Sequence, residues 1–111
     1  MGRVGLLDNK YIVLKDEFWD ERWINNSKTT IVFIYLLMNA NTNAEKYGKD
    51  RIRRGSLVTT NEKIVEKCGL TYQNVRSALA SLEKMGEIKR ERRNHYQIIT
   101  ITHYEDYKDD I

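Results

Sequence analysis

The sequence lacks the features that define several common classes of protein. Its 111 residues include one cysteine, Cys68, and no proline. A single cysteine excludes an internal disulfide and a four-cysteine zinc site, and it is typical of a reducing compartment. The longest apolar run, Ile31 to Met38, is far shorter than the ~20 residues that span a bilayer, and residues 1–10 lack the apolar core of a signal peptide. We therefore expect one cytoplasmic domain with no membrane partner.

The chain also lacks recognisable catalytic motifs. It has no glycine-rich phosphate loop, no nucleophile elbow and no cysteine–histidine spacing of a metal site. The acidic residues between Asp16 and Glu21 have the spacing of the solvated side of a short helix, and we interpret His103 as structural. These absences predict a protein that is not an enzyme and that uses no cofactor and no metal.

Charge is unevenly distributed along the chain. The formal net charge is +3, yet residues 1–50 are neutral. Residues 51–98 hold eleven Lys and Arg against five Asp and Glu, whereas residues 99–111 hold one against four. A basic middle segment of this kind is typical of a surface that binds an anionic polymer, and nucleic acid is the leading candidate.

The first half of the chain predicts elements that lead into one long helix. Residues 11–14 are predicted as a short strand, and residues 16–23 as a helical turn that buries its aromatic side chains. Ser27 is a suitable N-cap for a helix that begins at Lys28 and is apolar on most sides. The polar segment from Asn41 to Asp50 is predicted as a loop.

The second half predicts two helices that are close together. Residues 56–59 form a brief strand, and Thr60 caps a helix that ends at Gly69. Thr71 then caps a second helix, which extends from Tyr72 to about Met85. Two helices joined by a short turn that contains glycine are typical of a helix-turn-helix.

A β-hairpin is predicted directly after the second helix, with strands at 87–92 and 96–102. The order helix, strand, helix, turn, helix, hairpin predicts an α+β fold of the winged helix-turn-helix type. It would have a three-helix core, a short strand and a C-terminal β-hairpin wing. We expect residues 1–26 to be an N-terminal extension that packs on the core, residues 27–104 to form the winged-helix domain, and residues 105–111 to form an acidic tail.

The second helix of the pair is the predicted recognition helix. Val75, Ala78, Leu79 and Leu82 fall in one sector of its wheel, so the opposite sector is predicted to face a partner. In helix-turn-helix proteins this helix enters the major groove, where Gln pairs with adenine and Arg with guanine or a phosphate. The candidate DNA-binding residues of this helix are Thr71, Tyr72, Gln73, Arg76, Ser77 and Lys84. A solvated face is the alternative explanation for any one of them.

The hairpin and the segment before the first strand add further basic residues. The candidate DNA-binding residues of the hairpin are Lys89, Arg90, Arg92, Arg93 and His95. In a DNA-binding hairpin they would lie over a phosphate strand or a minor groove. Otherwise they would prevent the solvated edge of the hairpin from pairing with another strand. Arg53 and Arg54, with Arg51, would reach the DNA backbone from the flank or lie over apolar surface. Double-stranded DNA is therefore the predicted partner.

The motifs of the basic segment together resemble one protein family. They comprise RGSLVTT at 54–60, CGLT at 68–71, VRSAL at 75–79, GEI at 86–88 and IITIT at 98–102. This combination resembles the N-terminal winged-helix domain of phage replisome organiser proteins, which are related to the DnaD-type replication initiation proteins. The resemblance implies a role in starting DNA replication, in which the domain binds an origin and helps to recruit helicase-loading or primosome proteins.

Members of this family usually continue into a linker and a C-terminal helical domain, so a lone domain or part of a longer protein is expected here. Some DnaD-type winged helices self-associate. In a homo-oligomer of that kind, Phe18, Trp19 and Trp23 would lie in the interface, whereas otherwise they would complete the core. Three functions stay open: the DNA-binding domain of a phage or prophage replication initiator, a winged-helix transcriptional regulator of a mobile element, and an oligomerisation module of a primosome protein with weak DNA binding.

Overall fold

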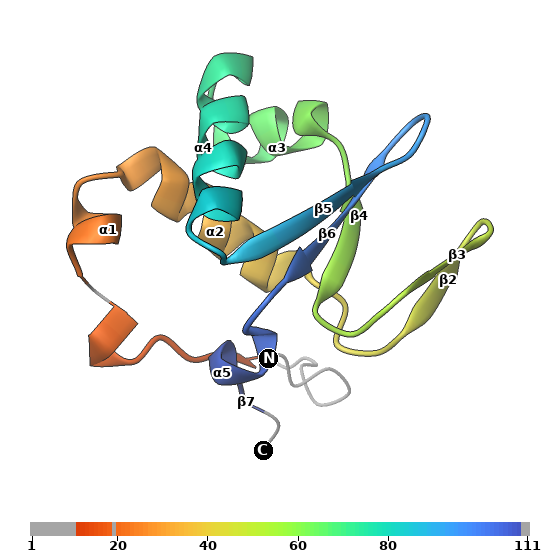
Figure 1. Cartoon of the computed structure of the whole chain (residues 1–111), viewed down its shortest axis with the longest axis horizontal. Helices are drawn as coiled ribbons and strands as arrows, with labels where there is room; N and C mark the ends of the chain where they lie inside the picture. The colour runs from red at the N-terminus through yellow and green to blue at the C-terminus, as the bar shows by residue number, and fades with distance from the viewer. Residues whose placement is uncertain (1–10, 19, 110–111) are drawn as a thin grey trace, which may run out of the picture.

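Helix α2 (Ser27–Asn39) runs through the middle of the molecule, and the other elements pack around it (Figure 1). The computed structural model describes residues 11–18 and 20–109. The remaining elements, in chain order, are β1 (Tyr11–Ile12), the 3-10 helix η2 (Asp16–Phe18), α1 (Glu21–Ile24), β2 (Glu45–Tyr47), β3 (Asp50–Ile52), β4 (Ser56–Thr59), α3 (Asn61–Cys68), α4 (Tyr72–Lys84), β5 (Ile88–Arg92), β6 (Gln97–Ile101), α5 (Tyr104–Tyr107) and β7 (Lys108–Asp109). The protein is an α+β domain, as predicted.

The strands of the described residues form small antiparallel sheets. The largest has three strands in the order β4-β6-β5, in which the predicted strands at 56–59, 87–92 and 96–102 are all present. β2 and β3 form a separate hairpin, and β1 pairs with β7. In Figure 1, the β5–β6 hairpin and the β2–β3 hairpin project from the same side of the molecule.

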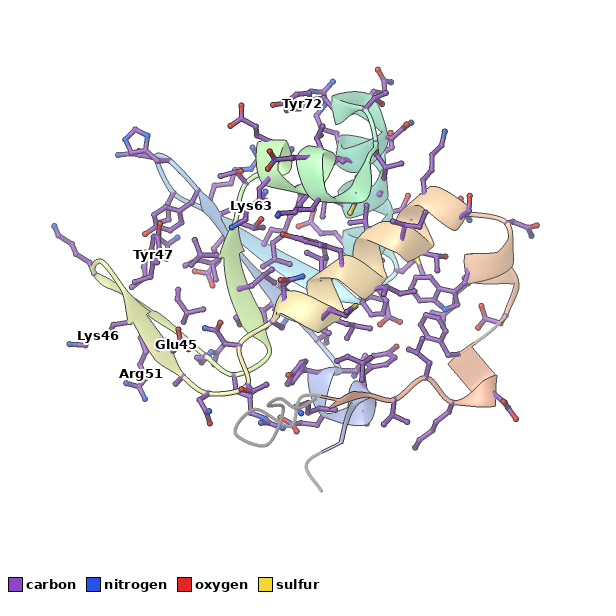
Figure 2. All side chains as sticks on the ribbon, turned by 180° about the vertical axis from the view of Figure 1, so that it is seen from behind. Glu45, Lys46, Tyr47, Arg51, Lys63 and Tyr72 are labelled. Atoms are coloured by element: carbon purple, nitrogen blue, oxygen red, sulfur yellow. The ribbon has the colours of Figure 1, made fainter. Side chains whose placement is uncertain are left out.

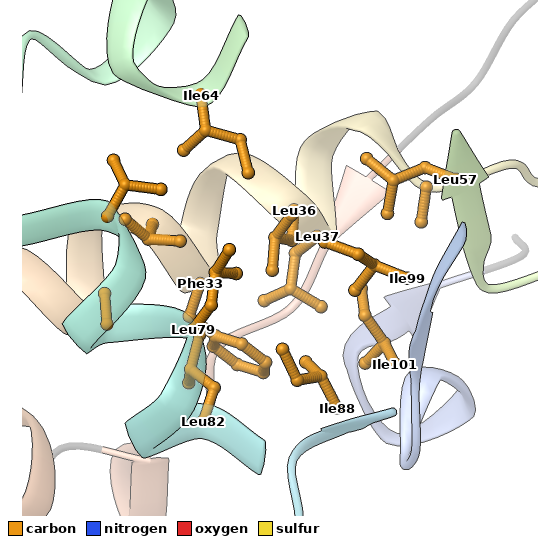
Figure 3. Packing of buried hydrophobic residues seen from close by; sticks show 14 of the residues in the cluster. Phe33, Leu36, Leu37, Leu57, Ile64, Leu79, Leu82, Ile88, Ile99 and Ile101 are labelled. Atoms are coloured by element: carbon orange, nitrogen blue, oxygen red, sulfur yellow. The ribbon is translucent and has the colours of Figure 1, made fainter. Parts of the chain in front are cut away.

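A continuous apolar core lies between α2, α4 and one face of the three-stranded sheet (Figure 3). Phe33, Leu36 and Leu37 of α2 are each 0% exposed, in agreement with the prediction of a helix that is apolar on most sides. Leu79 of α4 and Ile99 of β6 belong to the same cluster. Full burial of such a side chain stabilises the fold by about 1.5–3 kcal/mol, so this core fixes α4 relative to the sheet.

The predicted caps of α3 and α4 are confirmed. The Thr60 hydroxyl accepts from the Lys63 N–H, and the Thr71 hydroxyl accepts from the Asn74 N–H, both at 3.0 Å. Gly69 ends α3 with a φ of 67°, a left-handed conformation that favours glycine. The two helices are therefore separated by a short turn whose geometry is determined by local side-chain chemistry.

The start of α2 differs by one residue from the prediction. Ser27 is the first helical residue, and the N-cap is Asn26, whose side chain makes no cap hydrogen bond. The Asn26 amide instead donates to the Arg22 carbonyl oxygen at 3.1 Å. Thr30 supplies the local connection, because its hydroxyl donates to the carbonyl oxygens of Trp23 and Asn26. Contacts to α1 therefore replace the predicted Ser27 cap.

The prediction of a loop over residues 41–50 is wrong. The segment contains β2 and the first residue of β3, joined by the two-residue turn Gly48–Lys49. Gly48 has a φ of 60°, as the first central residue of a type II′ hairpin turn requires. The polar composition of the segment reflects the exposure of residues on both strands. It does not prevent the two strands from pairing.

The N-terminal aromatic residues of the described chain complete the core. Trp23 is 1% exposed, and its ring stacks on Phe18 at 4.6 Å and on Phe33 at 5.0 Å. Trp19 lies outside the described residues. Buried Trp23 is thus part of the core, and partly buried Phe18 packs against that core, in agreement with the core alternative. On α2 the exposed apolar side chains are Ile31 and Met38.

The C-terminal segment joins the folded body through α5. Tyr104 is 4% exposed and belongs to the core cluster, and Tyr107 contacts the Phe33 ring edge-on at 5.5 Å. The register of β7 pairs Lys108 with Ile12 of β1. The described part of the predicted acidic tail thus pairs with the first described strand, β1.

Candidate nucleic-acid interface

Helix α4 has one buried side and one polar side. Val75, Ala78, Leu79 and Leu82 are buried, as the helical wheel predicts. The predicted contact residues of the helix are all exposed: Tyr72, Gln73, Arg76, Ser77 and Lys84, preceded by the exposed cap Thr71. Within the part of the chain that the structure describes, no ion pair or side-chain hydrogen bond engages Arg76 or Lys84. Their charges therefore face solvent.

The hydroxyls at the start of α4 are partly used within the protein. The Thr71 hydroxyl caps the helix, and Tyr72, which is 45% exposed, donates from its hydroxyl to Glu62 of α3 at 3.3 Å (Figure 2). Burial and the Glu62 carboxylate raise the pKa of Tyr72 above its usual value, so its hydroxyl stays a proton donor. The pair also connects the two helices at the turn.

The strand register determines which hairpin cations face the helices. Arg90 pairs with Ile99, and Arg92 with Gln97. Because alternate residues share a face, Arg90 and Arg92 lie on the same face of the sheet as the buried Ile99. Lys89 lies on the opposite face. Two of the predicted basic residues of the hairpin are thus aimed toward the side occupied by α3 and α4.

A cavity of about 240 Å³ lies where the β5–β6 hairpin faces the start of α3. Its basic lining residues are Arg90, Arg92, Arg93 and His95. On the other side it is bordered by Thr60 and Asn61, and the Gln97 amide donates to the Asn61 side-chain oxygen at 2.6 Å. The fold therefore brings four of the predicted site residues around one open hollow.

Two of these four are engaged by carboxylates. The Arg90 guanidinium pairs with Glu83 of α4 at 2.8 Å. The Arg93 guanidinium donates to both oxygens of Asp50 and also to Glu91. The side chains of Arg92, His95 and Lys89 make no ion pair or hydrogen bond with another described residue, although the Arg92 carbonyl oxygen accepts from the Arg93 guanidinium at 3.2 Å. The hairpin thus has two kinds of cation. Some stabilise the structure through ion pairs, and the others face solvent.

Asp50 connects the β2–β3 hairpin to the cationic hairpin. Its carboxylate accepts from Arg93 and from the Tyr96 hydroxyl. These two hydrogen bonds, Arg93 first, lower the pKa of Asp50 below its usual value, and the same bond to Asp50 raises the pKa of Tyr96. The carboxylate is therefore ionised and neutralises Arg93 at neutral pH.

The two flanking arginines have different surroundings. Arg53 is exposed, whereas Arg54 donates to both oxygens of Glu105, at 2.7 and 2.9 Å, and to the Thr42 carbonyl oxygen at 2.8 Å. The Arg54 guanidinium also lies over the Tyr104 ring at 5.4 Å. Bidentate pairing lowers the pKa of Glu105. Arg54 thus connects the base of the β2–β3 hairpin to α5, away from the hollow.

Lys46 and Lys49 of the β2–β3 hairpin were not predicted as site residues, and Arg51 was predicted only as part of the basic group with Arg53 and Arg54. Lys46, Lys49 and Arg51 are exposed, and Tyr47 is 50% exposed. A turn signal was present, because Gly48 as the first of two central residues is typical of a type II′ hairpin. The flanking strands are short and polar, so they lack the alternation of apolar residues that would have indicated them.

Among the described residues, no helix is long and apolar enough to cross a membrane. No group of three metal-ligating side chains is found among them. No family model matches the chain, and comparisons with curated proteins and with solved structures found no significant match.

Proposed function

We propose that this domain binds double-stranded DNA as a winged helix, with α4 as the recognition helix and the β5–β6 hairpin as the wing. The observation that carries the proposal is that Arg92 and His95 line a cavity beside the start of α3, with Arg92 on the face of the sheet that turns toward the helices. This arrangement provides a solvent-facing cationic hollow next to a helix whose outer side is polar. Duplex DNA is a polyanion, and exposed cations of this kind neutralise its phosphates.

In this function the polar side of α4 enters the major groove. Arg76 and Gln73, both exposed, contact base edges, and Lys84 contacts phosphate. Arg92 and His95 of the wing contact the backbone of the adjacent strand. Arg90 and Arg93 are positioning residues here, since their guanidinium groups are occupied by Glu83 and by Asp50 and Glu91.

The biological role in this proposal is that of a phage or prophage replication initiator. It rests on the combination of RGSLVTT, VRSAL and GEI with the order of helices and hairpin. Binding of an origin and recruitment of helicase-loading or primosome proteins would follow from that role. A transcriptional regulator would use the same surface, and it would bind DNA without associating with a replication protein.

The test is a selection of duplexes from a random library by the wild-type chain, followed by affinity measurements on the selected site. We expect Arg76→Ala to weaken binding by about 1–3 kcal/mol and to relax the preference at one position. The control is Lys28→Ala, which removes an exposed cation at the start of α2 and should leave the affinity unchanged. A wild-type chain whose binding shows neither sequence preference nor salt dependence would contradict the proposal.

A further inference from the structure

The β2–β3 hairpin is attached to the rest of the molecule at both ends. At its base, the Asn41 N–H donates to the Ser56 carbonyl oxygen at 2.8 Å, and the Arg54 side chain donates to the Thr42 carbonyl oxygen at the same distance. Near its tip, Asp50 accepts from the wing residues described above. The hairpin therefore has a defined direction and is not an unattached loop.

The two faces of this hairpin differ in chemistry. Its register pairs Lys46 with Arg51 and Tyr47 with Asp50, so each pair occupies one face. The Tyr47 face lies against the wing, where its ring contacts Tyr96 edge-on at 4.9 Å. Figure 2 shows Tyr47 on the wing side of the hairpin and Lys46 and Arg51 pointing outward.

The outward face is positive, and among the described residues it has no local counter-charge. Neither Lys46 nor Arg51 makes an ion pair or side-chain hydrogen bond with another described residue. Exposed Lys49 at the turn adds a third cation. Of the acidic residues of the hairpin, Asp50 is neutralised by Arg93, and Glu45 shares the face of Tyr47 by alternation. Charge complementarity therefore favours a polyanion on this surface.

We propose that the β2–β3 hairpin is a second DNA-contacting arm, which binds the phosphate backbone beyond the segment covered by α4 and the wing. The inference rests on the proposed function, and it extends the contact surface to residues outside the helix-turn-helix and the wing. The two hairpins project from the same side of the molecule (Figure 1), and in this proposal a duplex bound at the wing continues past the β2–β3 hairpin. Such contacts add affinity that is independent of sequence.

The experiment measures binding of the whole chain to two duplexes of random sequence, of about 12 and about 24 base pairs, by fluorescence anisotropy over a range of salt concentrations. The longest extent of the molecule is 38 Å, which corresponds to about 11 base pairs at about 3.4 Å each. The longer duplex therefore extends past the wing. The variant is Lys46→Ala with Arg51→Ala, a pair from one exposed face.

The matched control is Lys15→Ala with Lys28→Ala, which removes the same charge from exposed positions next to η2 and at the start of α2. The segment that leads through α1 to the start of α2 lies on the opposite side of the molecule from the two hairpins (Figure 1). On the longer duplex, we expect the hairpin variant to reduce the slope of log affinity against log salt by about 2 in magnitude. The control should keep the wild-type slope. Lys49→Ala, at an exposed turn, should reduce the slope by about 1 without any effect on folding.

Three outcomes have distinct meanings. A smaller slope for both hairpin variants, with circular dichroism unchanged for Lys49→Ala, supports the second arm. Hairpin variants that bind like the control overturn the second arm and leave the proposed function intact. A wild-type chain with no salt-dependent binding to either duplex overturns both proposals.

Discussion

The Arg90 guanidinium of β5 donates to the Glu83 carboxylate of α4 at 2.8 Å. The Arg90 side chain is 13% exposed, and that of Glu83 is 40% exposed. This pair connects the end of the proposed recognition helix to the first strand of the proposed wing. Arg92 lies on the same face of β5 two residues later, and its guanidinium makes no ion pair or hydrogen bond with another described residue.

We expect Arg90→Ala and Arg92→Ala to affect different properties. Arg90→Ala should lower the free energy of unfolding by about 1 kcal/mol, because it removes an ion pair and packed methylene groups. Arg92→Ala should leave stability unchanged and should reduce the salt dependence of duplex binding by about 1 in slope. Urea denaturation and a salt titration of both variants measure the two effects. A stability loss in Arg92→Ala as large as that in Arg90→Ala would contradict this division of roles.

Gly55 is where the base of the β2–β3 hairpin comes close to α5. Its φ is 82°, and a Cβ atom there would lie 2.9 Å from the Tyr104 Cβ and Cγ atoms. Gly86 has nearly the same φ, 80°, with open space around it. Gly86→Ala should therefore cost about 1–2 kcal/mol of backbone strain, and Gly55→Ala should cost clearly more. Thermal unfolding of the two variants measures the difference, and equal melting temperatures would show that the close approach has no energetic effect.

Tyr107 should make the stability depend on pH in alkaline solution. Burial, followed by the Glu87 carboxylate that accepts from its hydroxyl, raises the pKa of Tyr107 to about 12. Since tyrosine in the unfolded chain titrates near about 10, the folded state binds this proton more tightly. The contribution to stability is full below about pH 10 and is lost as the pH rises toward about 12. Tyr107→Phe should show a smaller decline in unfolding free energy over that interval, as measured by urea denaturation.

The carboxyl group of Asp50 should titrate below its usual range in the folded protein. Arg93 and then Tyr96 lower its pKa by hydrogen bonding to the ionised form. The resulting contribution is present above the unfolded pKa of Asp, near about 3.9, and is lost as the pH falls through the lower folded value. NMR titration of the Asp50 side-chain carbon measures this pKa directly. In Arg93→Ala the midpoint should move up toward the unfolded value, and an unchanged midpoint would mean that Arg93 does not hold the carboxylate.

Local signals explain the parts of the fold that could be predicted. Thr60 and Thr71 cap helices through hydroxyls that act within three residues, so their effect does not depend on the rest of the chain. Val75, Ala78, Leu79 and Leu82 identify the buried side of α4 by spacing alone. The same spacing places Arg76 and Gln73 on the exposed side, so this part of the candidate site also follows from helical geometry.

The sequence by itself therefore determined the two capped helices, the strand before them, the hairpin after them, and the polar side of α4. Only the tertiary structure decided which arginine charges are neutralised, because an ion pair forms where folding brings a carboxylate close to a guanidinium. Arg54 finds Glu105 at a separation of 51 residues, and Arg93 finds Asp50 at a separation of 43. The tertiary structure also decided the position of the β2–β3 hairpin, since it is attached to Tyr96 and Arg93, which are far away in the chain.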